Sequence, residues 1–110
     1  MKLPNGDRAI VDERKLREYL LSTVHPVGRF KAAFFGQLGL TAANWETLQT
    51  QLATLASTGE AELDEITEFG RKYLISGTLT GSQGATRTIV SVWIILDGED
   101  DPRLVTVYPR

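Results

Sequence analysis

The sequence contains no cysteine, and it has one histidine, one methionine and four prolines among its 110 residues. Without cysteine there can be no disulfide and no thiolate ligand for a metal ion. The single histidine, His25, also argues against a zinc site, because carboxylates would have to supply the remaining ligands. We therefore expect neither a metal nor a cofactor.

Long apolar runs are missing as well. No stretch approaches the ~20 apolar residues that a membrane-spanning helix needs, and the start, MKLPNGD, lacks the apolar segment of a signal peptide. A chain of 110 residues lies in the usual range for one domain, roughly 100–200 residues. We expect a single domain over residues 1–110 that is cytoplasmic and has no membrane partner.

Charge of one sign is missing from part of the chain. The net charge is −2, which gives no general attraction to nucleic acid. Residues 40–70 contain six acidic residues and no basic one, whereas residues 1–39 contain seven basic and four acidic residues. This asymmetry is compatible with a local anion site, or with a charged surface that simply faces water.

The residues that are present predict an α+β fold, in which three N-terminal helices precede an antiparallel meander of three to four strands. The helical part covers about 12–58 and the sheet about 60–110. Predicted helices cover 13–23, 27–37 and 42–57. Predicted strands cover 71–80, 86–96 and 103–109, and the acidic segment 59–70 is either a short strand or a loop.

Helical spacing predicts which side chains face the core. The first helix should bury Leu16, Tyr19, Leu20 and Val24. The second helix should bury Phe30, Phe34 and Leu38, and Gly39 should follow its end as a left-handed residue. The third helix should bury Trp45, Leu48, Leu52, Leu55 and Ala56.

Alternation along the strand 86–96 predicts one continuous apolar face, which should pack on the helices. We assign Val90, Val92, Ile94 and Leu96 to this core face, with Val105 and Val107 beside them on the last strand. The opposite face then gathers a cation, two hydroxyls, an indole and a phenol, which suit a phosphate and a flat ring. These residues are Arg87, Ser91, Trp93, Thr106 and Tyr108. An ordinary half-exposed antiparallel sheet explains the same pattern.

The segment HPVGRFKA, residues 25–32, ends one predicted helix and begins the next. A helix N-terminus carries partial positive charge and attracts phosphate. Arg29 and Lys31 add two cations in the first turn, which is unfavourable for stability and therefore suggests a function. His25 is the one side chain here that exchanges protons near neutral pH. A structural histidine followed by two solvent-facing cations is the alternative.

Four segments together resemble a small bacterial family of domains of unknown function. The family pattern is LPN near the start, HPxGxxKAxFF in the middle, a VW pair, and PRLVTAYP at the end, and it covers nearly the whole chain. The chain departs from this pattern in two places: Val107 stands where alanine is commoner, and the spacing between Arg87 and Trp93 is lengthened. In layout the family is similar to ribonuclease toxins of the barnase, EndoU and RelE type.

The resemblance implies a metal-independent ribonuclease toxin that acts on RNA and is neutralised by a small cognate antitoxin or immunity protein. His25, Lys31, Arg87 and Thr106 would be catalytic, and Arg29, Ser91, Trp93 and Tyr108 would bind substrate. The alternative is a non-catalytic protein-binding module, of the antitoxin, immunity or adaptor kind, that uses the acidic 40–70 surface as its contact.

Overall fold

The computed structural model describes all residues from 1 to 110 and contains a helical half followed by one four-stranded sheet. The helical elements are η1 (Gly6–Arg8), α1 (Glu13–Lys15), η2 (Leu16–Leu20), α2 (Gly28–Gln37), η3 (Ala42–Asn44) and α3 (Trp45–Thr58). The strands are β1 (Ala61–Thr67), β2 (Gly70–Thr80), β3 (Thr86–Leu96) and β4 (Arg103–Pro109). The strands follow one another in the sheet in the order β1-β2-β3-β4, and every pair is antiparallel.

The predicted α+β class and the meander are thus confirmed, and the acidic segment does form a strand, β1. The first helix differs from its prediction. Only Glu13–Lys15 is α-helical, and the chain continues as a π-helix through η2, where the Leu21 N–H donates to the Leu16 carbonyl over 2.7 Å. The wider π turn brings Leu16, Leu20 and Leu21 into the core together, which a regular α-helix spacing does not anticipate.

The predicted faces of the first two helices are confirmed at Leu16, Leu20 and Leu38, which are buried, but one residue on each face was predicted wrongly. Val24 is 85% exposed, because the helix has already ended, and Phe30 is 67% exposed. Helix α2 instead buries Gly28, Ala32 and Phe35. Gly28 decides this rotation, because a Cβ there would collide with the Tyr19 carbonyl, so only glycine allows α2 to approach η2 this closely.

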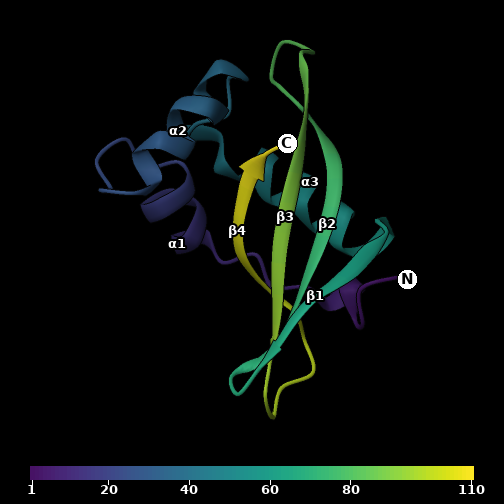
Figure 1. Ribbon diagram of the computed structural model, residues 1–110. Coiled ribbons are helices and arrows are strands. Elements are labelled where there is room, and N and C mark those ends of the chain that lie inside the picture. The colour runs from purple at the N-terminus through teal and green to yellow at the C-terminus, as the bar shows by residue number, and fades with distance from the viewer.

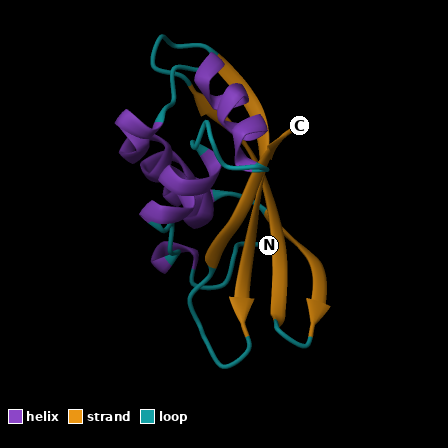
Figure 2. Cartoon of the chain, turned by 90° about the vertical axis from the view of Figure 1, so that its left-hand side faces the viewer, coloured by secondary structure: helices purple, strands orange, loops and turns teal.

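The helices cover one face of the sheet and leave the other bare (Figures 1 and 2). Our assignment of the two faces was inverted for β3, whereas Thr106, Val107 and Tyr108 of β4 lie on the faces predicted for them. The covered face, called the core face here, carries Tyr73, Ile75, Leu79, Ile89, Ser91, Trp93, Ile95, Leu104 and Val107. The other, called the open face, carries Leu74, Ser76, Thr78, Thr88, Val90, Val92, Ile94, Thr106 and Tyr108.

The inversion has a physical cause. Both alternating faces of β3 are apolar, so alternation alone cannot tell which of them meets the helices. The helices pack on the face with the largest side chain, Trp93, which is fully buried. A bulge then shifts the register of β4, so that Leu104 pairs with Trp93 and Thr106 pairs with Val92. This bulge displaces Val105 from the core face where alternation had placed it.

Helix α3 matches its prediction well, since it runs to Thr58 and buries Leu48, Leu52 and Ala56. Gly39 has the predicted left-handed backbone, with φ of 70°.

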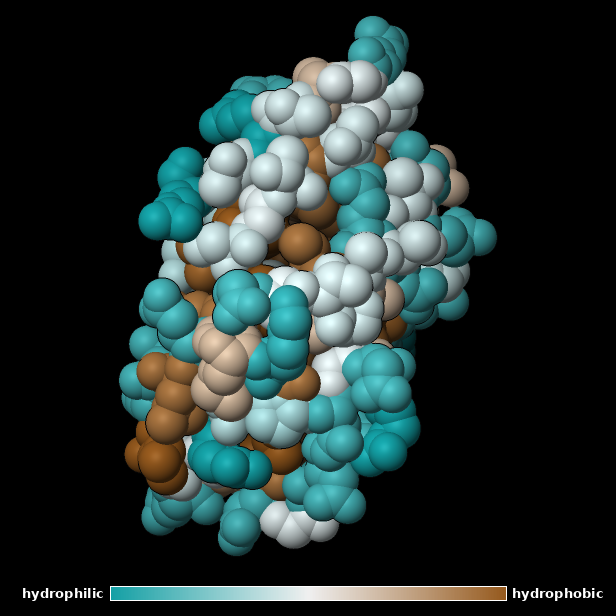
Figure 3. All heavy atoms as spheres, turned by 90° about the vertical axis from the view of Figure 1, so that its right-hand side faces the viewer, coloured by the Kyte–Doolittle hydropathy of each residue, from teal (hydrophilic) through white to brown (hydrophobic).

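Three large apolar side chains are exposed on β1 and in the turn after it: Leu63, Ile66 and Phe69. Figure 3 shows hydrophobic atoms near the lower end of the molecule among hydrophilic ones. None of the helices has the length and apolarity to cross a membrane.

Candidate functional site

Helix α2 lies along the outer edge of β4, which is the last strand of the sheet (Figure 1). The Lys31 ammonium donates to the Val107 carbonyl at 3.0 Å. A carbonyl at the free edge of a sheet lacks a strand partner, so this contact both caps the edge and fixes the position of Lys31. The ammonium also lies 6.0 Å from the centre of the Tyr108 ring.

His25 lies in the loop before α2 and accepts hydrogen bonds from the backbone at the start of that helix. Its Nδ1 accepts the N–H groups of Val27 at 3.0 Å and Gly28 at 2.9 Å, two donors that would otherwise lack partners at the helix start. Ser22 Oγ holds the loop itself by accepting the N–H of His25 at 3.1 Å. Because the Nδ1 lone pair is used, the hydrogen of the neutral ring resides on Nε2.

Tyr19 connects the histidine to the sheet. Its ring meets the His25 ring edge-on, with centroids 5.1 Å apart and an angle of 72°. Its hydroxyl lies 3.3 Å from Thr106 Oγ1 on β4, and the Lys15 ammonium lies 5.4 Å from its ring centre. The tyrosine therefore positions both the imidazole and the threonine hydroxyl.

We call this group the β4-edge cluster and define it by Tyr19, His25, Lys31, Thr106 and Tyr108. It brings together four of the eight residues that the sequence predicted for the site. The sequence analysis missed Tyr19 as a site residue because helical spacing gave it a sufficient role in the core. Its phenol, at an otherwise apolar helix face, was the signal that could have identified it.

Two predicted cations lie near this cluster without joining it. The Arg87 guanidinium, at the start of β3, lies 5.0 Å from the Phe34 ring centre. Phe34 is one turn after Lys31 on α2, so the two side chains lie on the same side of the helix. Arg29 lies over the exposed Phe30 ring at 4.8 Å, and it contacts neither β3 nor β4 through a hydrogen bond or an ion pair.

Ser91 and Trp93 require a correction, because both side chains are fully buried on the core face and cannot meet a substrate. Ser91 Oγ donates to the Ile75 carbonyl at 2.9 Å and accepts the Trp93 Nε1–H at 2.8 Å. Every polar atom of the pair is thus satisfied inside the protein. Their role is to let an indole and a hydroxyl be buried at low cost.

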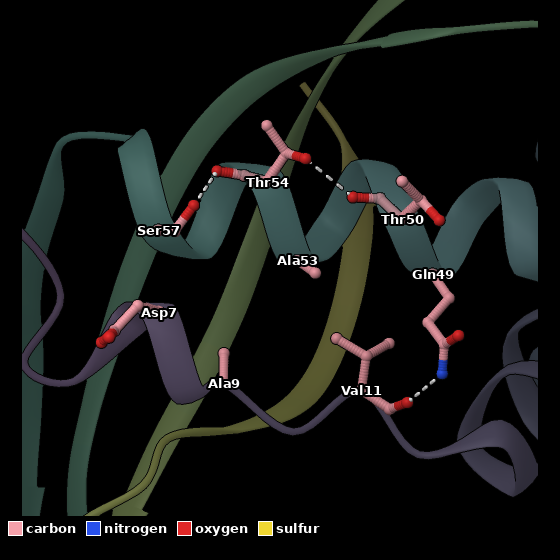
Figure 4. Close-up of a pocket in the computed structure, with 8 residues that line it drawn as sticks. All are labelled: Asp7, Ala9, Val11, Gln49, Thr50, Ala53, Thr54 and Ser57. Atoms are coloured by element: carbon pink, nitrogen blue, oxygen red, sulfur yellow. Dashed lines mark hydrogen bonds between the residues drawn. The ribbon is translucent and has the colours of Figure 1, made fainter.

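One groove away from this cluster offers few reactive side chains. A groove of about 510 Å³ runs between the N-terminal segment and α3, and Figure 4 shows the residues that line it. Asp7 is its one ionisable side chain, and the hydroxyls of Thr54 and Ser57 donate to carbonyls of α3 itself. No three His, Cys, Asp or Glu residues lie close enough together to hold a metal ion.

Comparison with known proteins identifies the family. A family model described as "Domain of unknown function (DUF6883)" matches residues 2–110. The chain belongs to the DUF6883 family. The β4-edge cluster is therefore built from residues that all lie within the family domain. No curated protein matches the chain.

A solved structure shares the fold of this DUF6883 domain. It is a chain from the contact-dependent growth inhibition toxin–immunity protein complex of Klebsiella pneumoniae 342, with a TM-score of 0.67 and 15% sequence identity. The match covers 96% of this chain and 97% of that one. At this identity the likeness concerns the fold alone.

Proposed function

We propose that this domain is a metal-independent ribonuclease-type toxin that cleaves RNA phosphodiesters at the β4-edge cluster. The observation that carries the proposal is the set of contacts that places the Lys31 ammonium and the Thr106 hydroxyl at β4 and connects the His25 imidazole to them through Tyr19. These are the donors that stabilise a phosphate whose charge grows in the transition state. Tyr108, which is 38% exposed and lies beside Lys31, offers a ring on which a base can stack.

The hydrogen bonds of His25 define its role in this proposal. Because Nδ1 accepts from the start of α2, Nε2–H is a donor and the ring is not available as a base without losing both helix contacts. His25 would donate to a phosphate oxygen while Lys31 compensates the charge. A neutral histidine at a helix N-terminus serves as such an electrophile in triosephosphate isomerase. The ribose 2′ oxygen would attack phosphorus and lose its proton to water. The P–O5′ bond would break as the new bond forms, and the departing 5′ oxygen would take a proton from water, which leaves a 2′,3′-cyclic phosphate and a 5′-hydroxyl end.

The toxin part of the proposal draws on the shared fold, since the similar chain comes from a toxin–immunity protein complex. A domain that cleaves cellular RNA must be neutralised in the cell that makes it. We therefore propose a small cognate immunity or antitoxin protein as partner, and the cytoplasm, where RNA is accessible, as the site of action.

The decisive experiment compares two substitutions of His25 in the purified protein. His25→Ala removes both the N–H acceptor and the Nε2 donor, whereas His25→Asn keeps an acceptor for the helix N–H groups. We expect both variants to lose cleavage of a fluorescent RNA by about 10²–10³-fold. Only His25→Ala should also lose stability, by about 1 kcal/mol in urea unfolding.

Lys31→Met and an assay with EDTA complete the test. Loss of cleavage in Lys31→Met, with full activity in EDTA, is expected. A folded wild-type protein that leaves RNA intact, and that does not arrest growth when produced without any partner, would show that the domain is not a ribonuclease toxin. Full activity in His25→Asn would show that His25 only caps α2.

A non-catalytic binding module remains the second candidate function, and β1 favours it. The carboxylates of Glu62, Asp64, Glu65 and Glu68 are all exposed along this edge strand and its turn. If the domain is a partner-binding module, charge reversal at Glu62 should abolish binding of a co-purifying cognate protein. The ribonuclease proposal predicts that Glu62→Lys leaves RNA cleavage unchanged.

A further inference from the structure

The cations without an ion-pair partner gather at one end of the molecule. Six of the twelve Lys and Arg side chains form ion pairs: Lys2, Arg8, Arg14, Arg17, Lys72 and Arg103. Of the other six, four lie where α2 flanks the sheet, β3 begins and β4 ends. These four are Arg29, Lys31, Arg87 and Arg110.

Carboxylate side chains are absent from the segments that build this end. Residues 19–45, which include α2, contain no Asp or Glu, and neither do residues 69–96 or 102–110. The acidic residues of the sheet half lie in 60–68 and 97–101, which are β1 with its turn and the turn between β3 and β4. Both turns are at the opposite end of the sheet (Figure 1). The cations therefore remain free to bind an anion.

Arg110 extends this positive region onto the open face. Its backbone N–H donates to the Thr88 carbonyl at 3.0 Å, and its Nη1 donates to Ser76 Oγ at 3.0 Å. The guanidinium thus lies across β3 and reaches β2. Exposed hydroxyls of Thr78 and Thr88 belong to the same face, and hydroxyls with Arg and Lys are typical of contacts to a sugar–phosphate backbone.

Arg87 places a further cation near Lys31, on the side of the sheet opposite to Arg110. It pairs with the buried Leu79, so its side chain lies on the helix-covered side of the sheet, and its guanidinium is 5.0 Å from the ring of Phe34, one helical turn after Lys31 on α2. Tyr108 lies between Lys31 and Arg110 in the structure, since it is two residues before Arg110 and its ring is 6.0 Å from the Lys31 ammonium. A row of cations with one flat ring inside it suits a polyanion with stackable bases.

We propose that this end is a binding track for single-stranded RNA, with flanking phosphates at Arg87 and Arg110 on either side of the phosphate at Lys31, and a base on Tyr108. The inference rests on the proposed function and names its substrate class. An acidic protein fits less well, because the hydroxyls of Ser76, Thr78 and Thr88 surround Arg110 on the open face, and hydroxyls combined with arginine are typical of contacts to a sugar–phosphate backbone.

Binding is measured apart from cleavage, by fluorescence anisotropy with a 2′-O-methyl RNA oligonucleotide, whose blocked 2′ oxygen cannot attack phosphorus. Arg110→Gln and Arg87→Gln should each weaken binding about tenfold. Each should also reduce the slope of log affinity against log salt by about 0.7. Arg71→Gln is the matched control, because Arg71 is exposed and unpaired but lies at the acidic end of the sheet, and it should bind like wild type.

Equal losses in all three variants, or none in any, would overturn the track. So would equal affinity for a duplex, or equally effective competition by polyglutamate, which would indicate an acidic protein partner instead. Tyr108→Leu should weaken binding of the single strand, and unchanged binding would remove the stacking subsite. These outcomes are independent of the ribonuclease proposal, which fails separately if wild type binds RNA as described but does not cleave the unmodified oligonucleotide.

Discussion

Tyr19 is the residue on which the geometry of the β4-edge cluster depends. Its ring orients His25, and its hydroxyl reaches Thr106, so one side chain joins the loop before α2 to the last strand. The substitution Tyr19→Phe separates these two contacts, because it keeps the ring and removes the hydroxyl.

We expect Tyr19→Phe to lower kcat for RNA cleavage by about tenfold with little change in KM, since Thr106 loses its orienting partner. Stability should fall by only about 0.5–1.5 kcal/mol, the net value of one hydrogen bond. Thr106→Val should lower kcat further, because it removes the hydroxyl that donates to the phosphate, and the double variant should be no worse than Thr106→Val alone. Additive losses in kinetic assays would show that the two hydroxyls act independently.

For Ser91 we expect a loss of stability rather than a loss of activity, because its side chain lies in the core and not in the β4-edge cluster. Ser91→Ala leaves the buried Trp93 N–H and one acceptor without a partner. We expect a loss of about 1–3 kcal/mol in chemical unfolding. The kcat of the folded fraction should be unchanged. A fall in kcat at unchanged stability would return Ser91 to the active site.

Helix α2 is the element that assembles the site, and its two glycines have different roles. At Gly28 a Cβ would collide with the Tyr19 carbonyl, whereas at Gly36 a Cβ would meet no atom within 4 Å. We expect Gly28→Ala to destabilise the protein by about 1–3 kcal/mol and to lower activity, because α2 must move away from η2.

The matched variant Gly36→Ala should stabilise the protein by about 0.5–1 kcal/mol, the ordinary gain of alanine in a helix interior. Thermal unfolding of both variants tests this pair. If Gly28→Ala were as stable as wild type, the close approach of α2 and η2 would not be what positions His25.

On the scale of the whole molecule, charge is separated along the sheet. The protein is 36 Å long, and the screening length at physiological salt is about 8 Å. The acidic turn between β3 and β4 should therefore not affect anion binding at the other end. We expect Asp100→Asn to leave RNA affinity unchanged at ~0.15 M salt and to raise it at ~0.01 M, where the screening length is about 30 Å. Anisotropy titrations at the two salt concentrations test this prediction.

The sequence by itself determined the α+β class, the order of helices before a meander, the end of α3, and the boundaries of β2, β3 and β4, because these depend on local periodicity and on glycine. It also singled out the loop from His25 to Lys31, where two cations at a helix start break an ordinary rule of stability. Only the tertiary structure decided which face of β3 is covered. Both faces are apolar, and the helices pack on the face that carries the large Trp93 side chain. The π turn of η2 and the bulge in β4 likewise arise from packing, and together they bring Tyr19 to Thr106 and form the cluster.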